Sequence, residues 1–283
     1  MIIIIVSNEE FNKFNKRGWN KLSKSNNLFS NTSLPEYGPY MKNEYELELF
    51  KNVAGKKVLE LGCGCGKSLE FLANKGAAEL WGIDISQEQI IKARDLKLEN
   101  SNFLISSMEK NPGLPLKYFD YVLSLYSIGY SVDPLKTLKL SSEYLKSGGK
   151  FILCWTHPFF NCLGIKDEKI VVSHNYNDED FRLIKKGNDE VELFQYNLKI
   201  STLINGIISS GLEIDSIIEE SDMCCATSYK SSYFHERKLA VAPTTLIIVA
   251  HKKLYIEELS NGKYYVYFYC IYTDNGMIKK YFI

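Results

Sequence analysis

The stretch VLELGCGCGKSLEFL, residues 58–72, places a glycine-rich loop between a short apolar run and a helical pattern. Its three glycines, Gly62, Gly64 and Gly66, stand at every second position. Residues 58–61 have the pattern of a buried strand, and the apolar spacing after the glycines has the period of a helix. A loop of this composition lets the backbone approach a ligand closely. The stretch therefore predicts a ligand site in an α/β domain.

Strand-like and helical patterns alternate along most of the chain. Apolar runs that predict strands lie at 58–61, 79–85, 103–107, 119–126 and 150–155. The helical pattern before the last of them has Asp133 as its cap and ends at Gly148-Gly149. A helix at about 198–210 and two strand-like runs, LEIDSIIE and TTLIIVAHKK, extend the series. This alternation predicts a doubly wound α/β domain with a parallel sheet.

Three segments differ in character from this core, which we place at 51–253. Residues 1–50 carry aromatic side chains ahead of the glycine loop, and we expect this segment to cover the ligand. Residues 158–194 are polar and aromatic with hairpin-like patterns, which predicts a cap inserted into the core. Residues 254–283 hold two Asn-Gly dipeptides between strand-like runs, which predicts a three-stranded β-meander. Its aromatic middle strand needs cover on both faces, so we expect it to dock on the main domain or to form a homodimer.

Composition excludes several classes of protein. Lys plus Arg and Asp plus Glu both number 34, and this balance argues against a nucleic-acid partner. No apolar run reaches the roughly 20 residues of a membrane span, so we expect no membrane partner. The seven cysteines are odd in number and form no CxxC pair. We therefore expect a cytoplasmic protein without a structural metal site.

The spacing of the loop decides between candidate ligands. A dinucleotide site has the pattern G-x-G-x-x-G, whereas this chain has G-x-G-x-G with Glu60 two residues earlier. A carboxylate at that position suits a ligand with a cationic centre better than a pyrophosphate. Asp84, at the end of the second strand, can accept hydrogen bonds from both hydroxyls of a ribose. The alternative is that Asp84 serves only as an acid at the start of the helix after Ser86.

With GLPLKYFDYVLSLYSIGYSVDP (113–134) and LKSGGKFILCW (145–155), these motifs resemble those of the class I S-adenosylmethionine-dependent methyltransferases. Within that family the resemblance is to the small-molecule, methyltransferase type 11-like group. It implies a Rossmann-like, doubly wound sheet of seven mostly parallel strands with an antiparallel closing strand. It also implies S-adenosyl-L-methionine as cofactor and S-adenosyl-L-homocysteine as product.

The resemblance further implies which residues contact the cofactor. The loop would lie against the methionine moiety and the ribose, and Asp84 would bind the ribose hydroxyls. Ile85 and Met108 would pack on the two faces of the adenine. Ser107 stands where many family members have an Asp for the adenine amino group, with Glu109 near. The expected cofactor-binding residues are Glu60, Gly62, Cys63, Gly64, Gly66, Asp84, Ile85, Ser107, Met108 and Leu125.

The acceptor is expected to be a small molecule that is methylated at oxygen or nitrogen without a metal. The sulfonium activates the methyl group, so the enzyme mainly aligns and desolvates the reactants. No [DNS]-P-P-[YF] motif follows the fourth strand, which argues against methylation of nucleic-acid amino groups. His157, after the fifth strand, is a candidate general base or a positioning residue. The resemblance implies that Tyr126 lines the methyl-transfer channel.

Aromatic residues of the first segment and of the later loops are candidates for the acceptor pocket, with ordinary packing as the alternative. Two other functions stay open. One is a non-catalytic member of the fold that binds cofactor or partner. The other is a nicotinamide-dependent oxidoreductase, which the glycine spacing and Glu60 argue against. The expected pocket residues are Trp19, Tyr37, Tyr40, Tyr130 and Phe159.

Overall fold

The computed structural model describes residues 6–24, 34–35, 37–38, 40–186, 191–221 and 236–254. The chain divides into two compact units, Met1–Lys252 and Lys253–Ile283. The β-meander expected in the second unit lies outside the described residues, apart from Leu254. The first unit contains every element described below.

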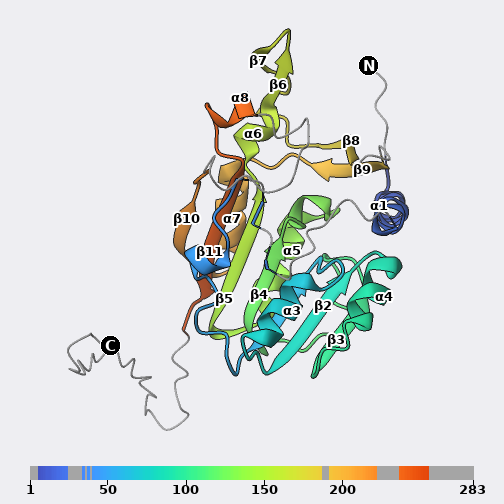
Figure 1. Cartoon of the computed structure of the whole chain (residues 1–283), viewed down its shortest axis with the longest axis vertical. Helices are drawn as coiled ribbons and strands as arrows, with labels where there is room; N and C mark the ends of the chain where they lie inside the picture. Colours follow the sequence, from blue (N-terminus) through green and yellow to red (C-terminus); the bar gives the residue numbers. More distant parts are fainter. Residues whose placement is uncertain are drawn as a thin grey trace, which may run out of the picture. The chain divides into compact units, whose positions relative to one another are not determined.

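A seven-stranded sheet forms the centre of this unit, in the order β10-β11-β5-β4-β1-β2-β3 (Figure 1). The parallel pairs are β1 with β2, β1 with β4, β2 with β3 and β4 with β5, while β11 is antiparallel to β5 and β10. The expected fold, a mostly parallel sheet with an antiparallel closing strand, is confirmed. The strands are β1 (Lys57–Leu61), β2 (Glu79–Asp84), β3 (Ser101–Ile105), β4 (Phe119–Leu125), β5 (Leu145–Thr156), β10 (Leu212–Ile218) and β11 (Thr245–Lys252).

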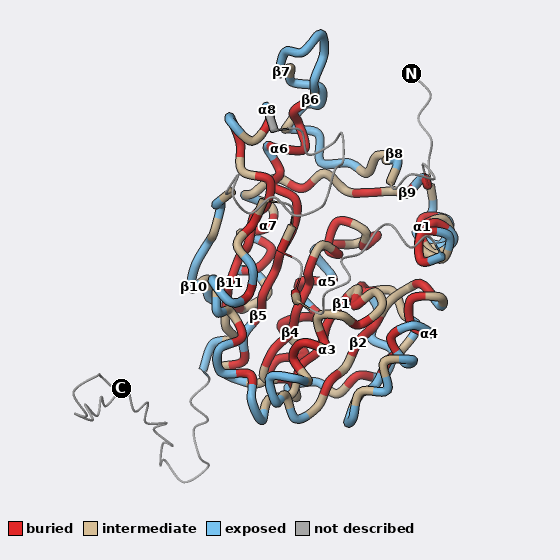
Figure 2. Tube along the Cα trace, in the orientation of Figure 1, coloured by how far each residue is buried: buried red, intermediate tan, exposed pale blue. Residues whose placement is uncertain are grey.

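Helices cover both faces of the sheet because the central strands bury side chains on both sides. Leu59 of β1 belongs to one core cluster with Leu138 and Leu203 of the helices α5 (Pro134–Tyr144) and α7 (Ile200–Ser209). Val58, on the opposite face of β1, belongs to a second cluster with residues of α3 (Lys67–Asn74) and α4 (Gln87–Asp95). Figure 2 shows the buried backbone concentrated in the central strands.

One expected boundary between helix and strand is wrong. The helix α5 ends at Tyr144, and β5 begins at Leu145, before the glycines expected to end the helix. Leu145 is buried and pairs with Phe119 of β4, so sheet pairing extends the strand backwards. The cap of this helix is as expected, because Asp133 Oδ1 accepts a hydrogen bond from the Lys136 N–H (2.9 Å).

The region after β5 contains two separate antiparallel hairpins. They follow the short helix α6 (Pro158–Cys162), and Figure 1 shows them beyond the carboxyl ends of the parallel strands. The first hairpin pairs β6 (Leu163–Lys166) with β7 (Lys169–Val172), and the second pairs β8 (Phe181–Lys186) with β9 (Val191–Tyr196). We refer to residues 158–196 as the cap hairpins.

The remaining elements lie outside the sheet. The N-terminal helix α1 (Asn8–Ser23) lies between β9 and α4 (Figure 1). The short elements are α2 (Glu44–Leu47), the 3-10 helix η1 (Ile128–Tyr130) and α8 (Glu236–Leu239). No helix in the described ranges is long and apolar enough to cross a bilayer.

Candidate active site

The glycine loop connects β1 to α3 at the carboxyl end of the sheet. All three glycines have positive φ angles, namely 71° at Gly62, 53° at Gly64 and 78° at Gly66, a region that other residues rarely adopt. The N–H groups of Gly62 and Cys63 both donate to the carbonyl of Ile83 (2.8 and 3.0 Å), which fastens the loop to β2. The loop is therefore a fixed turn.

The three glycines face different surroundings. A Cβ at Gly62 would lie 2.4 Å from the Cβ of Ser127, so the loop touches the segment after β4 there. A Cβ at Gly66 would meet Ala93, Leu96 and Phe103 at 3.2–3.3 Å. A Cβ at Gly64 would meet nothing within 4 Å. Gly64 is thus the glycine whose open side can face a ligand.

Glu60 places a buried carboxyl group beneath this loop. The residue is 3% exposed, and its Oε2 atom has no hydrogen-bond partner in the described part of the chain. Burial raises the pKa of Glu60 to about 8, a hydrogen bond with Ser68 opposes this shift, and the charge of Asp84 adds to it. An unpartnered buried carboxyl oxygen is costly, and a cationic group beside it would remove that cost.

Asp84, at the end of β2, holds the turn together from the other side. Its Oδ2 accepts a hydrogen bond from the Gly64 N–H (3.0 Å), and its Oδ1 accepts one from the Ser86 N–H (2.7 Å). Burial raises the pKa of Asp84 to about 6, although these two bonds act in the opposite direction. Since a carboxylate has about four acceptor positions, this one can still accept bonds from a ligand's hydroxyls.

Three asparagines of α1 attach the helix to its surroundings, and two of them reach the turns after β2 and β3. Asn20 Oδ1 accepts from the hydroxyl of Ser86 (2.7 Å), which also caps α4. Asn12 Nδ2 donates to Glu109 Oε1 (2.8 Å). Asn15 exchanges two hydrogen bonds, of 2.8 and 2.9 Å, with the backbone of Phe194 in β9. The helix α1 therefore lies beside the turns that follow β2 and β3, next to Asp84 at the end of β2.

A row of four aromatic side chains runs from α1 to the end of β4. The ring centroids of Trp19 and Tyr130 are 5.0 Å apart, and those of Tyr130 and Trp155 are 5.3 Å apart, both edge to face. Tyr126 follows at 6.0 Å from Trp155. The ammonium group of Lys186 lies 4.9 Å from the Trp19 ring and donates to the Tyr130 hydroxyl (3.0 Å). Side chains from α1, η1, β5 and the residue after β4 thus form one aromatic wall.

Tyr126 has an unusual backbone for a bulky residue. Its φ is 51°, so it occupies the left-handed region directly after β4. Its hydroxyl lies 2.6 Å from Thr245 Oγ1 of β11, and a Cβ at Gly38 would come within 2.1 Å of that hydroxyl. The phenol therefore lies at the ends of β4 and β11, under the N-terminal segment.

His157 forms a dyad with Glu219 at the end of β5. The residue is 5% exposed, and its Nε2 lies 2.9 Å from Oε1 of Glu219, which follows β10. Its Nδ1 is buried without a hydrogen-bond partner among the described residues. If Glu219 accepts the Nε2 proton, the lone pair of the neutral ring is on Nδ1.

Comparison with known proteins gives the family. A sequence model described as "Methyltransferase domain" matches residues 52–198, slightly more than half of the chain. The chain belongs to the class I S-adenosylmethionine-dependent methyltransferases. The match contains the glycine loop, Asp84, His157 and the cap hairpins, whereas α1, Glu219 and β11 lie outside the matched residues.

Individual relatives are distant. An uncharacterized protein of Haemophilus influenzae is 27% identical to this methyltransferase over 219 residues, which are 73% of this chain and 85% of the relative. A ubiquinone biosynthesis O-methyltransferase of Aliivibrio fischeri is 26% identical over 157 residues, 54% of this chain and 64% of the relative. The crystal structure of a putative S-adenosylmethionine-dependent methyltransferase from Listeria monocytogenes superposes with a TM-score of 0.62 at 23% identity, over 74% of this chain and 97% of that one. The last likeness concerns the fold alone.

Tyr37 and Cys63, two of the residues expected to contact ligands, direct their side chains into the core. Tyr37 is 2% exposed, and its hydroxyl donates to Glu44 Oε2 (2.6 Å), so its side chain lies in the core rather than in an open pocket. Burial and the neighbouring Glu44 raise its pKa well above the usual range. Cys63 packs its sulfur against Gly82 of β2, because the turn directs the side chain inward. Only the backbone of Cys63 can face a ligand in this arrangement.

The other expected site residues differ in how far their side chains are exposed. Met108 is buried, and its sulfur would lie 3.4 Å from a Cβ at Gly62, which places it beside the loop. Leu125 is buried in the core cluster that contains Cys63. Phe159 is 41% exposed on α6. Ile85, Ser107, Tyr40, Trp19 and Tyr130 are half-buried.

Glu109 was expected near the adenine edge, whereas its contacts and the partner of His157 were not predicted from the sequence. Glu109 accepts hydrogen bonds from Asn12 and from Ser131 (3.2 Å), so it joins α1 to the segment before α5. Glu219 lies 62 residues from His157 in the chain, and no local sequence pattern predicts that the two side chains pair. In the described ranges, no group of three or more His, Cys, Asp or Glu side chains is placed to hold a metal ion.

Proposed function

We propose that this methyltransferase transfers the methyl group of S-adenosylmethionine to an oxygen or nitrogen of a small-molecule acceptor, without a metal. The observation that carries the proposal is the pair of carboxyl groups around Gly64. Glu60 offers a buried oxygen that no described residue hydrogen-bonds, which suits the amino group of the cofactor's methionine moiety. Asp84 retains acceptor positions for the ribose hydroxyls. A loop with open space at Gly64 separates the two.

The remaining cofactor contacts follow from the positions of the strand ends. The adenine would lie along the turns after β2 and β3, with Ile85 on one side and Met108 on the other and Ser107 at its edge. The helix α1 would cover it, since Asn20 and Asn12 fasten that helix to the same two turns. The bound cofactor supplies an electrophilic methyl group, and the chain supplies alignment and exclusion of water.

The acceptor would bind between the aromatic wall and His157. The half-buried rings of Trp19, Tyr130 and Tyr126 support a planar or apolar acceptor. His157, held through Nε2 by Glu219, would accept the acceptor's proton at Nδ1. The likeness to an O-methyltransferase of ubiquinone biosynthesis favours oxygen as the methylated atom.

The first test measures which of the candidate cofactors the protein binds. Calorimetric titration with S-adenosylmethionine, S-adenosylhomocysteine and NADH should give micromolar binding of the first two and none of the third. Binding of NADH alone would support the oxidoreductase alternative. Binding of the first two without methyl transfer to any acceptor would favour a non-catalytic member of the fold.

A second measurement tests the base with acceptors that gain a methyl group. His157→Gln should lower kcat by about 10²–10⁴-fold, the range for loss of general base catalysis, and leave the affinity for S-adenosylhomocysteine unchanged. His251→Gln, at the far end of β11 where it pairs with Lys150, is the matched control and should change neither. An unchanged kcat in His157→Gln would remove this residue from the proton transfer.

A further inference from the structure

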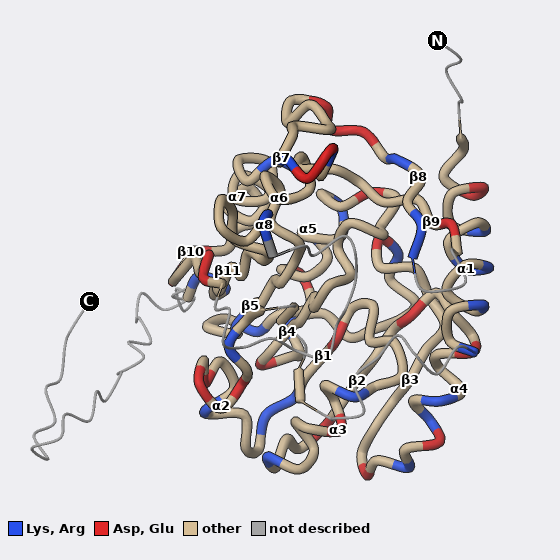
Figure 3. Tube along the Cα trace, turned by 45° about the horizontal axis from the view of Figure 1, so that its top comes forward, with Lys and Arg blue, Asp and Glu red and all other residues tan. Residues whose placement is uncertain are grey.

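At one side, the helix α1 is fastened to the turns that follow β2 and β3. Asn20 Oδ1 accepts hydrogen bonds from the Ser86 hydroxyl (2.7 Å) and from the Glu88 N–H (3.3 Å), at the start of α4. Asn12 Nδ2 donates to Glu109 (2.8 Å), a residue that is only 4% exposed. After the first turn, the exposed side of α1 carries mainly Lys and Arg, as Figure 3 shows. The two asparagine contacts therefore hold the inner side of the helix at points about 12 Å apart along its axis.

On the side of the cap, α1 is fastened to the β8–β9 hairpin. Asn15 is 1% exposed, and its amide group donates one hydrogen bond to the backbone of Phe194 in β9 (2.9 Å) and accepts another from it (2.8 Å). The rings of Phe11 and Phe14 lie 5.4 and 4.5 Å from the Phe194 ring. Phe11 also lies 5.5 Å from the ring of Phe181 in β8. A buried amide whose donor and acceptor are both used fixes the hairpin relative to the helix.

The β8–β9 hairpin is not hydrogen-bonded into the large sheet. In the described ranges its strands pair only with each other. Outside the hairpin, the elements that β9 contacts most extensively are α1 and η1. The other hairpin, β6–β7, packs instead on Phe160 and Ala242. The position of β8–β9 beside the aromatic wall, which it contacts through Lys186, therefore depends largely on α1.

We propose that α1 couples the cofactor site to the acceptor site, with Asn15 as the positioning residue that completes the acceptor pocket through the β8–β9 hairpin. The identity of the two ligands rests on the proposed function. In the free protein, the helix and the hairpin open together, and the cofactor binds only the closed form. A ligand on the turns after β2 and β3 stabilises the contacts of α1 there, and the 16-residue helix carries this constraint to Phe194 as a rigid element. The acceptor then binds more tightly to the complex with cofactor than to the free protein.

Hydrogen exchange of the full chain, with and without S-adenosylhomocysteine, tests this coupling and needs no acceptor. At a ligand concentration of about 100 times Kd, exchange should slow in residues 58–66 of the glycine loop. It should also slow in residues 191–196 of β9, by about five- to a hundredfold. Residues 163–172 of the other hairpin are the internal control and should exchange at an unchanged rate. Slowing that is confined to the loop and the neighbouring turns in the wild type would overturn the proposal.

Asparagine-to-alanine substitutions on this one helix give matched variants. Asn15→Ala should abolish the slowing in residues 191–196 and retain it in the glycine loop. Asn8→Ala, at an exposed position of the same helix, is the control and should behave as the wild type. Asn12→Ala and Asn20→Ala, at half-buried positions, are independent tests should Asn15→Ala fail to fold, and they should also reduce the slowing. Slowing in residues 191–196 that persists in these variants would overturn the role of α1.

Kinetics with an acceptor that gains a methyl group test the acceptor side of the coupling. Asn15→Ala should raise the KM of the acceptor by about five- to 150-fold, the range of coupling between two sites, without a comparable loss of kcat. An unchanged acceptor KM would overturn the assignment of Asn15 to the acceptor pocket. Absence of S-adenosylhomocysteine binding would defeat the proposed function but leave the helix testable without ligand. In that case the double variant Asn12→Ala, Asn20→Ala should still speed exchange in residues 191–196, and unchanged exchange would overturn the link through α1.

Discussion

At the residue scale, two carboxyl groups determine the chemistry of the glycine loop. Glu60 and Asp84 were both predicted from their positions at strand ends, because the carboxyl ends of neighbouring parallel strands meet at one edge of the sheet. Their different environments were not predictable. Asp84 is satisfied by backbone N–H groups, whereas one oxygen of Glu60 is not, and this difference depends on burial and on the path of the turn.

Cofactor binding should depend on pH through Glu60. Its pKa without ligand is about 8, and a neighbouring ammonium group favours the ionised form, so binding below that pH must release a proton. Affinity for S-adenosylhomocysteine should therefore rise between about pH 6 and about pH 7.5, by at most about tenfold for each pH unit. Calorimetry in buffers of different ionisation enthalpy measures the released proton directly.

The variant Glu60→Gln separates this effect from general charge effects. It should bind more weakly at the higher pH and lose most of the proton release, the remainder coming from Asp84. Glu99→Gln, on the exposed turn before β3, should behave as the wild type. Proton release that is equal in Glu60→Gln and wild type would show that the ammonium group does not lie beside Glu60.

At the element scale, the loop and α1 differ in how far the sequence predicted them. The turn between β1 and α3 was predicted because three glycines at alternate positions separate a strand pattern from a helical pattern. The attachment of α1 was not, since asparagines that bind distant backbone and side-chain groups look like ordinary surface residues. The inward direction of Cys63 also escaped prediction, because it depends on the φ angle of Gly62 and the space beside Gly82.

Two alanine substitutions in the loop should differ in their effects: one mainly lowers stability, and the other mainly weakens cofactor binding. Gly62→Ala combines a positive φ with a clash against Ser127, so it should lower the free energy of unfolding by about 2–4 kcal/mol. Gly64→Ala adds only the cost of its φ, about 1–2 kcal/mol. Its methyl group, however, would occupy the open side of the loop and weaken cofactor binding by about tenfold or more.

Denaturant unfolding and calorimetry on the same two proteins measure both quantities. Gly55→Ala, at a turn with a positive φ and open space far from the loop, is the control for backbone strain alone. Cofactor affinity that survives in Gly64→Ala would mean that the ligand does not approach the loop at this glycine.

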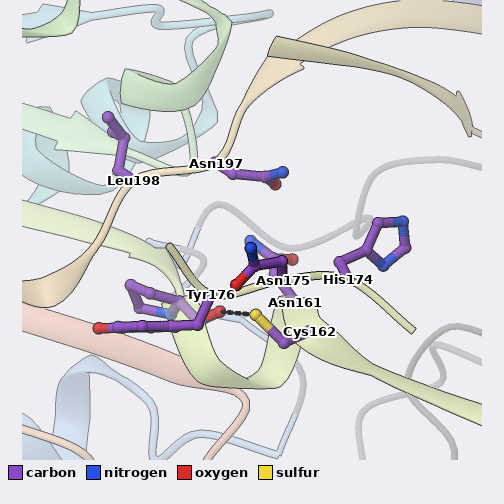
Figure 4. A pocket seen from close by; sticks show the side chains of 8 residues that line it. Asn161, Cys162, His174, Asn175, Tyr176, Asn197 and Leu198 are labelled. Atoms are coloured by element: carbon purple, nitrogen blue, oxygen red, sulfur yellow. Dashed lines mark hydrogen bonds between the residues drawn. The ribbon is translucent and has the colours of Figure 1, made fainter. Parts of the chain in front are cut away.

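At the scale of the whole molecule, the sheet was predictable because buried strands alternate with amphipathic helices. The seven strands and the antiparallel closing strand were expected from the family resemblance rather than from the alternation itself. The start of β5 was not predictable, since pairing with β4 outweighs the two glycines. The small hollow next to α6 (Figure 4) was not predictable either, because its wall comes from segments that are separated in the sequence by up to 40 residues, from Pro158 to Leu198.

A separate prediction concerns the C-terminal segment, residues 254–283. A chain that ends after Lys253, the first residue of the second unit, should show altered subunit association or a lower melting temperature, because the aromatic runs of the tail need cover. Sedimentation and thermal unfolding of the two lengths measure this. Cofactor affinity serves as the internal control, since Glu60 and Asp84 belong to the first unit. An identical association state and melting temperature of the two lengths would show that the tail contributes to neither property.

The hairpins of the cap pair only strands that are consecutive in the chain, and the large sheet closes through β5 and β11 without them. Insertions, deletions or replacement of a whole hairpin therefore leave the main hydrogen-bond ladder intact. Sequence changes in the cap hairpins can therefore accumulate without disturbing the sheet that holds the glycine loop. The same separation would let a cap from one family member be grafted onto the sheet of another.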